Sequence, residues 1–219
     1  MKPPIVDTNH AVTLCGGAEV QPKVVSLALR FAPNLVAADG GAGAVLRLGH
    51  IPQAVIGDFD SLDADIIAQI PSERIHRIPE QQTTDFDKCL RNIRAPYILA
   101  VGFTGGRLDH ELAVYNVLTK HPDQPCVVLG AVDLCLLVTD QLRLTLPVGT
   151  RVSLFPMGAC NVSATGLRWP VEGLEMAPDG QIGTSNEATG GEITVQTTAP
   201  KLLLILPLEH LDAVIAALG

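Results

Sequence analysis

Short apolar runs alternate with segments of helical periodicity along the first part of the chain. The helical segments, with apolar residues three and four positions apart, predict helices at Pro22–Phe31, Ala42–Leu48, Ala64–Gln69, Asp85–Ile93 and Leu108–Lys120. The apolar runs predict strands at Ala11–Cys15, Leu35–Ala38, Ala54–Ile56, Ile75–Ile78, Tyr97–Val101 and Cys126–Leu129. Strands and helices in alternation are typical of βαβ units. We therefore expect an α/β fold, a doubly wound, mostly parallel sheet with helices on both faces.

The pattern changes after Gly130. Apolar runs separated by Pro-x-Gly and Gly-Gly turns predict strands at Leu134–Val138, Leu142–Leu146, Arg151–Phe155, Glu192–Gln196 and Leu202–Leu206. Helical periodicity returns only at Leu208–Leu218. This is typical of an antiparallel β unit closed by a terminal helix. We therefore expect two domains, an α/β domain over residues 1–130 and a smaller β domain over residues 131–219.

Composition narrows the classes of function. Hydrophobic residues make up 47% and charged residues 17% of the chain, which allows a sizeable core and argues against disorder. The formal charge of −8 argues against non-specific nucleic-acid binding. The sequence has no apolar run of membrane-spanning length and no signal-like N-terminus, so we expect a cytoplasmic protein with no nucleic-acid or membrane partner. Five widely spaced cysteines, three of them inside apolar runs, predict core packing.

Two carboxylates follow directly after the predicted strand Ala54–Ile56. The strand ends at Gly57, and Asp58 and Asp60 come next. In open α/β sheets ligands bind outside the carboxyl ends of the strands, which is where these side chains would lie. A structural alternative is a simple turn, because Asp and Gly favour turns and Ser61 is a good helix N-cap. For this stretch alone both interpretations remain open.

The same arrangement recurs after three other predicted strands. The polar segments are Asp39-Gly40-Gly41-Ala42, Thr84-Asp85-Phe86-Asp87-Lys88 and Gly105-Gly106-Arg107-Leu108-Asp109-His110. Each has a structural alternative: Asp39 as a turn residue, Asp87 in a capping box with Thr84, and Asp109 at a helix N-terminus. Together, however, they bring carboxylates from four strands to one edge of the sheet.

Carboxylates gathered at one edge repel one another, and a divalent cation relieves that repulsion. Mg²⁺ is typically bound by one or two carboxylates together with substrate phosphates. Lys88 and Arg107 add positive charge, and glycine turns present backbone N–H groups to phosphate oxygens. The P-loop and dinucleotide-binding glycine motifs are both absent from the sequence. These features predict metal-assisted phosphoryl transfer at an Mg²⁺–nucleotide site.

The motifs in this order resemble those of the thiamine pyrophosphokinase family. The resemblance rests on the four polar segments above and on two segments of the second domain, Gly166-Leu167-Arg168-Trp169-Pro170 and Thr184-Ser185-Asn186-Glu187. It implies transfer of a diphosphate from ATP to the hydroxyl of thiamine, which gives thiamine diphosphate and AMP. It also implies a C-terminal β-sandwich that binds thiamine, and a homodimer with active sites at the subunit interface.

The resemblance assigns roles to individual residues. Asp58, Asp60 and Asp85 would be the catalytic residues that hold Mg²⁺ and the triphosphate. ATP would be bound by Asp39, Gly40, Gly41, Lys88, Arg107, Asp109 and His110. Thiamine would be bound by Gln81, Trp169, Ser185 and Asn186. For Trp169, the only tryptophan, the alternative is a core residue; as a ligand it would pack against the cationic rings of thiamine.

The sequence departs from the family pattern at two positions. Gly43 stands where the family often has Asn, and Val114 stands where an Asn often follows Leu-Asp-His, with Asn116 nearby but out of register. Neither departure removes a carboxylate, so we expect altered nucleotide contacts and retained activity.

Two other functions remain to be weighed. One is a pyrophosphokinase that acts on a pterin alcohol, because a related fold serves that substrate. The other is a nucleotide-binding regulator without turnover. One assay separates the three functions: it measures whether AMP is released from ATP and which alcohol is required for the release.

Overall fold

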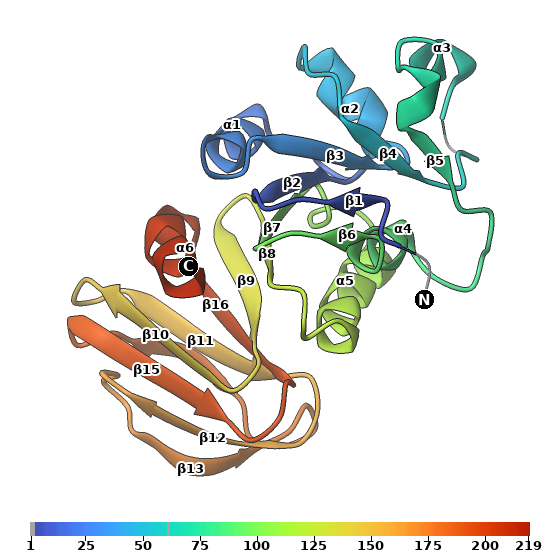
Figure 1. Ribbon diagram of the computed structural model, residues 1–219. Coiled ribbons are helices and arrows are strands. Elements are labelled where there is room, and N and C mark those ends of the chain that lie inside the picture. Colours follow the sequence, from blue (N-terminus) through green and yellow to red (C-terminus); the bar gives the residue numbers. More distant parts are fainter. Residues whose placement is uncertain (1–2, 61) are drawn as a thin grey trace. The chain divides into compact units, whose positions relative to one another are not determined.

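The computed structural model describes residues 3–60 and 62–219, which form two compact units (Figure 1). The first unit comprises Met1–Val117 and Cys126–Ala131, and the second comprises Leu118–Pro125 and Val132–Gly219. The helix cap predicted at Ser61 lies outside the described residues. None of the helices in the described ranges is long and apolar enough to cross a membrane.

The first unit is built on a parallel sheet with the strand order β8-β7-β2-β3-β4-β5. Its strands are β2 (Val12–Cys15), β3 (Asn34–Ala38), β4 (Ala54–Gly57), β5 (Ile75–Arg77), β7 (Ile98–Val101) and β8 (Cys126–Leu129). All neighbouring pairs are parallel, and every residue of β2, β4, β7 and β8 is buried. Such burial is expected when both faces of a parallel sheet are covered, and it confirms the predicted sheet.

The order of the strands reverses beside β2. From β2 the chain builds β3, β4 and β5 on one side and then crosses to β7 and β8 on the other. Ligands of open α/β sheets bind at the carboxyl ends of the strands near such a reversal. The topology therefore places the candidate site at the edge where β2, β3, β4 and β7 end.

Helices connect the strands of this sheet. They are α1 (Pro22–Phe31), α2 (Gly41–Arg47), α3 (Ala64–Ile67), α4 (Asp85–Leu90) and α5 (Leu108–Lys120), with a 3₁₀ turn, η1 (Ser72–Arg74). In Figure 1, α1 and α2 lie on one face of the strands and α4 lies on the other. The predicted helix at Asp85–Ile93 was too long, because the chain leaves α4 at Leu90 and forms β6 (Ile93–Arg94), which pairs with β1 (Val6–Asp7).

The second unit contains two groups of antiparallel strands. One has the order β14-β11-β16-β9 and the other the order β10-β15-β12-β13. The strands are β9 (Asp133–Val138), β10 (Gln141–Leu146), β11 (Arg151–Pro156), β12 (Cys160–Thr165), β13 (Val171–Met176), β14 (Gly183–Glu187), β15 (Gly191–Thr197) and β16 (Leu202–Pro207). Exposed and buried residues alternate along β10, as in a strand with one face in the core. The predicted β-sandwich is confirmed.

The second unit also shows what the apolar pattern missed. Strands β12, β13 and β14 add to those that the apolar runs predicted. The predicted C-terminal helix begins as a 3₁₀ turn, η2 (Leu208–His210), and continues as α6 (Leu211–Leu218). Helix α6 contacts β10 of the same unit.

The glycine turn after β3 packs tightly against β2. A Cβ atom at Gly41, the first residue of α2, would lie 2.1 Å from the carbonyl oxygen of Cys15. A Cβ atom at Gly40 would meet nothing within 4 Å, and Gly40 has ordinary helical angles, φ −53° and ψ −18°. Adjacent glycines therefore meet different demands: Gly41 allows a close backbone approach, whereas Gly40 leaves open space beside its backbone.

We predict that Gly41→Ala destabilises the protein and that Gly40→Ala does not. The methyl group of alanine at position 41 must displace the backbone at Cys15. Overpacking of this kind costs about 1–3 kcal/mol. Gly40→Ala is expected to leave the free energy of unfolding unchanged or to raise it by about 0.4–1 kcal/mol, because the folded backbone already suits alanine. Urea unfolding of both variants measures the difference. Equal stability would contradict the close approach.

Candidate active site

Adjacent parallel strands bring two acidic residues to the same edge of the sheet. Asp39 follows β3 and Asp58 follows β4, and these strands pair through Ala38 and Ile56. The backbone N–H of Asp39 donates to the carbonyl oxygen of Ile56 at 3.0 Å, so the ladder continues to the first residue of the turn. The predicted convergence of Asp39 and Asp58 thus follows from strand order.

The two turns after β3 and β4 interlock. Asp39 and Phe59 both have positive φ, 39° and 64°, a region that non-glycine residues seldom adopt. The Phe59 N–H donates to Asp39 Oδ1 at 2.9 Å. A Cβ atom at Gly57 would lie 2.8 Å from Asp39 Cβ, so a larger residue there would push the two turns apart. Asp39 therefore shapes its turn and also directs a carboxylate toward the second turn.

Three carboxylates meet at this edge. Asp39, Asp58 and Asp60 each offer an oxygen within 4.8 Å of the others, with Asp39 and Asp58 buried and Asp60 exposed. Burial, together with the charge of Asp85, raises the pKa of Asp39. Hard carboxylate oxygens are the donors that Mg²⁺ and Ca²⁺ prefer. The donor set therefore fits a divalent cation, which would relieve the repulsion among the three groups.

Lys88 provides the positive charge inside this group. It lies on α4 and is only 1% exposed, and its Nζ contacts Asp58 Oδ2 at 2.6 Å and Asp85 Oδ1 at 3.0 Å. The hydrogen bond from Lys88 lowers the pKa of Asp58. Burial disfavours the charge of Lys88, but its bonds to Asp58 and Asp85 outweigh this and raise its pKa. Lys88, which the sequence predicted as an ATP contact, is thus a counterion of Asp58 and Asp85 in the structure.

Asp85 joins the acidic group through Lys88. It is the first residue of α4, whose N-cap Thr84 accepts a hydrogen bond from the backbone N–H of Asp87. Burial raises the pKa of Asp85 more than its bond to Lys88 lowers it. The structure therefore assembles Asp39, Asp58 and Asp60 directly and connects Asp85 to Asp58 by way of the Lys88 ammonium group.

The loop before α4 carries Gln81 to the same carboxylate. Gln81 Nε2 donates to Asp58 Oδ2 at 3.1 Å. Glu80 accepts from the backbone N–H groups of Gln82 and Thr83 at 2.8 and 3.1 Å and pairs with Arg91 at 2.6 Å. Glu80 also accepts a hydrogen bond from the Thr83 hydroxyl, and this bond is the main reason why the pKa of Glu80 is lowered to about 2. Glu80 thus fixes the loop beside Gln81.

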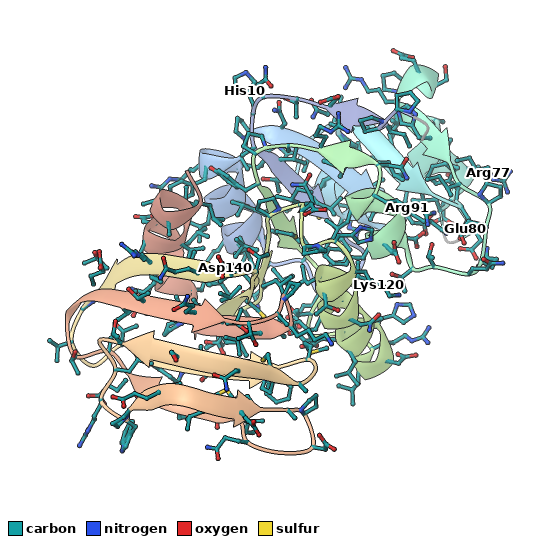
Figure 2. The ribbon with its side chains drawn as sticks, turned by 60° about the horizontal axis from the view of Figure 1, so that its bottom comes forward. His10, Arg77, Glu80, Arg91, Lys120 and Asp140 are labelled. Carbon is teal, nitrogen blue, oxygen red and sulfur yellow. The ribbon has the colours of Figure 1, made fainter. Side chains whose placement is uncertain are left out.

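The sequence did not point to these supporting residues. Figure 2 shows Glu80 and Arg91 facing each other, with Arg77 at the end of β5. Arg77 Nε donates to the backbone carbonyl of Asp58 at 3.1 Å. The sequence analysis gave no role to Glu80 or Arg77, and only the folded loop reveals their part in holding Asp58 and Gln81.

The predicted ATP contacts after β7 form a separate pair. Arg107 donates to both oxygens of Asp109, at 3.1 and 2.6 Å, just at the start of α5. Both side chains are well exposed, as is His110. The hydrogen bond from Arg107 lowers the pKa of Asp109. The structure therefore presents a guanidinium group at the end of β7, oriented by its own carboxylate.

The two departures from the family pattern lie in different surroundings. A Cβ atom at Gly43 of α2 would lie 2.9 Å from Cδ1 of Ile66 in α3. Val114 is 4% exposed, among the core residues of the first unit, whereas Asn116 is exposed on α5. An asparagine at 114 would therefore place a polar side chain in the core, whereas a larger side chain at 43 would require only the end of the Ile66 side chain to move.

The predicted thiamine residues of the second unit lie together. Trp169 is 50% exposed, so the alternative of a core tryptophan is wrong. The guanidinium of Arg168 lies 4.9 Å from its ring centroid. Ser185 is exposed with φ 60°, and the adjacent Asn186 is buried and hydrogen-bonded to the backbone of Trp169. Exposed aromatic and hydroxyl groups thus stand beside a buried amide.

Comparison with known proteins covers both units. Residues 26–129 match the family described as thiamin pyrophosphokinase, catalytic domain, and residues 141–202 match its vitamin B1 binding domain. The chain is 30% identical to thiamine pyrophosphokinase 1 of Arabidopsis thaliana, over 84% of this chain and 82% of that protein. It is 31% identical to thiamine pyrophosphokinase 1 of Oryza sativa subsp. japonica, over 80% of this chain and 81% of that protein.

A solved structure supports the fold. Thiamin pyrophosphokinase from Candida albicans superposes with a TM-score of 0.77 at 17% identity and covers 94% of each chain. This likeness extends over both the α/β unit and the β-sandwich unit.

We predict that Lys88→Met strongly destabilises the metal-free protein at neutral pH. It leaves the buried Asp58 without its counterion, and removal of one partner of a buried pair costs about 3–5 kcal/mol. Asp58 has a lowered pKa in the folded state, so the pair contributes stability above the ordinary value of 3.8 and loses it as the pH falls through the folded value.

The difference in stability between wild type and Lys88→Met should therefore be large at pH 7 and shrink in acid. Urea unfolding in the presence of a chelator, across this pH range, measures it. Lys23→Met, at an exposed lysine of α1, is the control and should stay near wild type. A pH-independent difference would mean that Lys88 acts through packing alone.

Proposed function

Because the chain belongs to the thiamin pyrophosphokinase family, we infer that it transfers a diphosphate from ATP to the hydroxyl of thiamine, with thiamine diphosphate and AMP as products. The observation that carries this inference is the acidic group of buried Asp39, buried Asp58 and exposed Asp60, with the counterion Lys88, in the unit that matches the catalytic domain. It lies at the carboxyl ends of β3 and β4, on the edge of the sheet at which open α/β folds bind ligands.

The second unit favours thiamine over the alternatives. Residues 141–202 match a vitamin B1 binding domain, which a pterin pyrophosphokinase would not need. Relatives at about the same identity across both units are named as pyrophosphokinases, which favours an enzyme over a regulator without turnover.

We propose Mg²⁺ as the divalent metal, with Asp58 and Asp60 as its main ligands. Both belong to the carboxylate group within 4.8 Å, which Asp39 completes. Asp85, the third ligand in the sequence prediction, contacts this group through Lys88, so we propose it as an outer member of the site. When bound, Mg²⁺ would neutralise charge on the triphosphate.

The residues of the chain would then align the reactants. Gly40 and Gly41 would offer backbone N–H groups in the glycine turn after β3, where no side chain stands between the backbone and a phosphate. Arg107, with Asp109 and His110 beside it, would offer an exposed guanidinium to phosphate oxygens. The thiamine hydroxyl oxygen attacks the β-phosphorus and releases its proton to solvent, the bond from that phosphorus to the α–β bridging oxygen breaks, and AMP leaves with that oxygen. Such a transfer depends mainly on position and charge.

For thiamine we propose Trp169, Ser185 and Gln81 as contacts. An exposed aromatic face suits a flat cationic heterocycle, by stacking and by cation–π attraction. Gln81 belongs to the first unit and Trp169 to the second, and the family resemblance implies that they meet across subunits. We therefore propose a homodimer with shared active sites.

We also propose that the protein works in the cytoplasm. All five cysteines are free and buried. Reduced thiols are typical of that compartment.

We predict that the protein releases AMP from ATP with thiamine and not with a pterin alcohol, and that Asp58→Asn and Asp60→Asn each remove most of this activity. Loss of a group that stabilises developing charge costs about a hundredfold or more in rate. AMP release in the presence of Mg²⁺ measures turnover. Asp65→Asn, at an exposed carboxylate of α3 that is outside the acidic group, is the control and should keep wild-type turnover. Near-normal turnover of both Asp58→Asn and Asp60→Asn would show that these two residues only shape a turn.

We predict that Trp169→Ala raises the KM for thiamine by about five- to twentyfold, as expected for the loss of a cation–π and stacking contact, and leaves the KM for ATP nearly unchanged. Trp169→Phe should recover part of the loss. Ile182→Ala, at another exposed apolar residue of the second unit, is the control. A KM for thiamine that stays constant in Trp169→Ala would place the thiamine site elsewhere.

A further inference from the structure

The segment that carries Trp169 is paired with the chain just after β14. The backbone N–H of Thr189 donates to the Gly166 carbonyl at 2.9 Å, and the N–H of Arg168 donates to the Glu187 carbonyl at 2.8 Å. Leu167 and Ala188 form an antiparallel bridge between these two bonds. The backbone ladder is thus in register up to Arg168, one residue before Trp169.

A side chain continues this ladder. Asn186 Oδ1 accepts the backbone N–H of Trp169 at 3.1 Å, and Asn186 Nδ2 donates to the Trp169 carbonyl at 2.8 Å. A carboxamide has the same donor and acceptor as a peptide group. The Asn186 side chain therefore pairs with both backbone polar groups of Trp169, as a neighbouring strand would.

Asn186 is itself held firmly. It is 7% exposed, and its Oδ1 also accepts the N–H of Glu187 at 2.8 Å. Hydrogen bonds in so buried a position are shielded from competition by water. The amide thus has a fixed orientation before any ligand is present.

A β-bulge precedes this amide in the sequence. Along β11 and β14 the register runs from Val152 opposite Asn186 to Leu154 opposite Gly183, so β14 has one extra residue. Ser185 lies in the bulge with φ 60°, and its N–H donates to Ser153 Oγ at 3.0 Å. Bulges redirect side chains, and strained non-glycine backbone is concentrated at functional sites. The sheet is therefore distorted at the residue next to Asn186.

The ring of Trp169 depends on this anchor. With half of its surface exposed, it is not fixed by burial in a core. Its described neighbour on the face is Arg168, whose guanidinium also pairs with Glu187 at 3.5 Å across exposed surface. An exposed ion pair of this kind contributes little. The two bonds from Asn186 to the backbone of Trp169 are thus the firm connection of this residue to the sheet.

We propose that Asn186 is a positioning residue that fixes the Trp169 backbone, and so presents the indole ring to thiamine before thiamine binds. This rests on the proposed function for the role of Trp169, but the clamp itself is independent of any ligand. It gives Asn186 a different part from the direct thiamine contact that the family resemblance implies.

The single tryptophan makes this testable without substrate. In Asn186→Ala the fluorescence anisotropy of Trp169 should fall and its quenching by acrylamide should rise, because no other tryptophan contributes. The KM for thiamine should rise about five- to tenfold, the effect of losing one or two neutral hydrogen bonds, while kcat and the KM for ATP change little. Asn186→Asp keeps the shape of the side chain but loses the Nδ2 donor. Its anisotropy, quenching and KM for thiamine should change in the same direction, and it replaces Asn186→Ala as the test if the alanine variant does not fold.

Asn161→Ala is the matched control. Asn161 Nδ2 also donates to a backbone carbonyl of the second unit, that of Gly173, at 3.2 Å. Its removal should lower Tm without a change in Trp169 anisotropy or in the KM for thiamine. Lost stability alone would therefore not reproduce the effect of Asn186→Ala.

A double-mutant cycle separates positioning from direct contact. If Asn186 acts through Trp169, then Asn186→Ala should add little to the KM for thiamine in a Trp169→Ala background. A full additional rise there, with unchanged anisotropy in the single variant, would overturn the proposal and make Asn186 a direct ligand. If the protein acts on another alcohol, thiamine-dependent AMP release is absent from wild type, and the anisotropy still decides whether Asn186 holds Trp169.

Discussion

Repulsion among buried carboxylates is the constraint on which the candidate active site depends. Two adjacent strands, β3 and β4, deliver Asp39 and Asp58 to one edge, and Asp60 follows two residues later. Lys88 makes this possible in the free protein by placing its ammonium group against Asp58 and Asp85. A fully buried lysine is itself costly and is tolerated only when its charge is paired. The acidic residues and Lys88 thus stabilise each other's charges. A bound divalent cation would further reduce the repulsion among the carboxylates, which Lys88 already offsets in part.

The backbone conformation of the turns after β3 and β4 also supports this acidic group. Asp39 and Phe59 take positive φ angles, and the absence of a side chain at Gly57 lets their turns approach. The Phe59 N–H that binds Asp39 Oδ1 helps to offset this strain. Positive φ angles and charged side chains therefore occur together at the carboxyl ends of β3 and β4, on the edge where an α/β sheet binds its ligand.

The sequence predicted the strands that are continuous apolar runs. It missed β12, although Cys160, Val162 and Ala164 alternate with polar residues there, and it missed β14. Ala54–Ile56 and Cys126–Leu129 are continuous apolar runs, and they are buried strands in the structure. Strand β14, Gly-Thr-Ser-Asn-Glu, has no apolar residue and is held by its partner β11 and a bulge, so no periodicity reveals it. Helical spacing places Lys88 beside Asp85, three residues away. Its stronger contact, with Asp58 thirty residues earlier, depends on how α4 packs on β4.

Two of the three proposed thiamine contacts, Gln81 and Trp169, lie in segments held by polar side chains that bind backbone groups. Glu80 accepts the N–H groups of Gln82 and Thr83 and so fixes the loop of Gln81, and Asn186 binds both backbone groups of Trp169. Neither supporting residue belongs to the acidic group. Gln81, however, donates to the same Asp58 oxygen that binds Lys88. A change of charge at Asp58 therefore acts directly on Gln81, so that carboxylate links the proposed metal ligands to a proposed thiamine contact within a single unit of the fold.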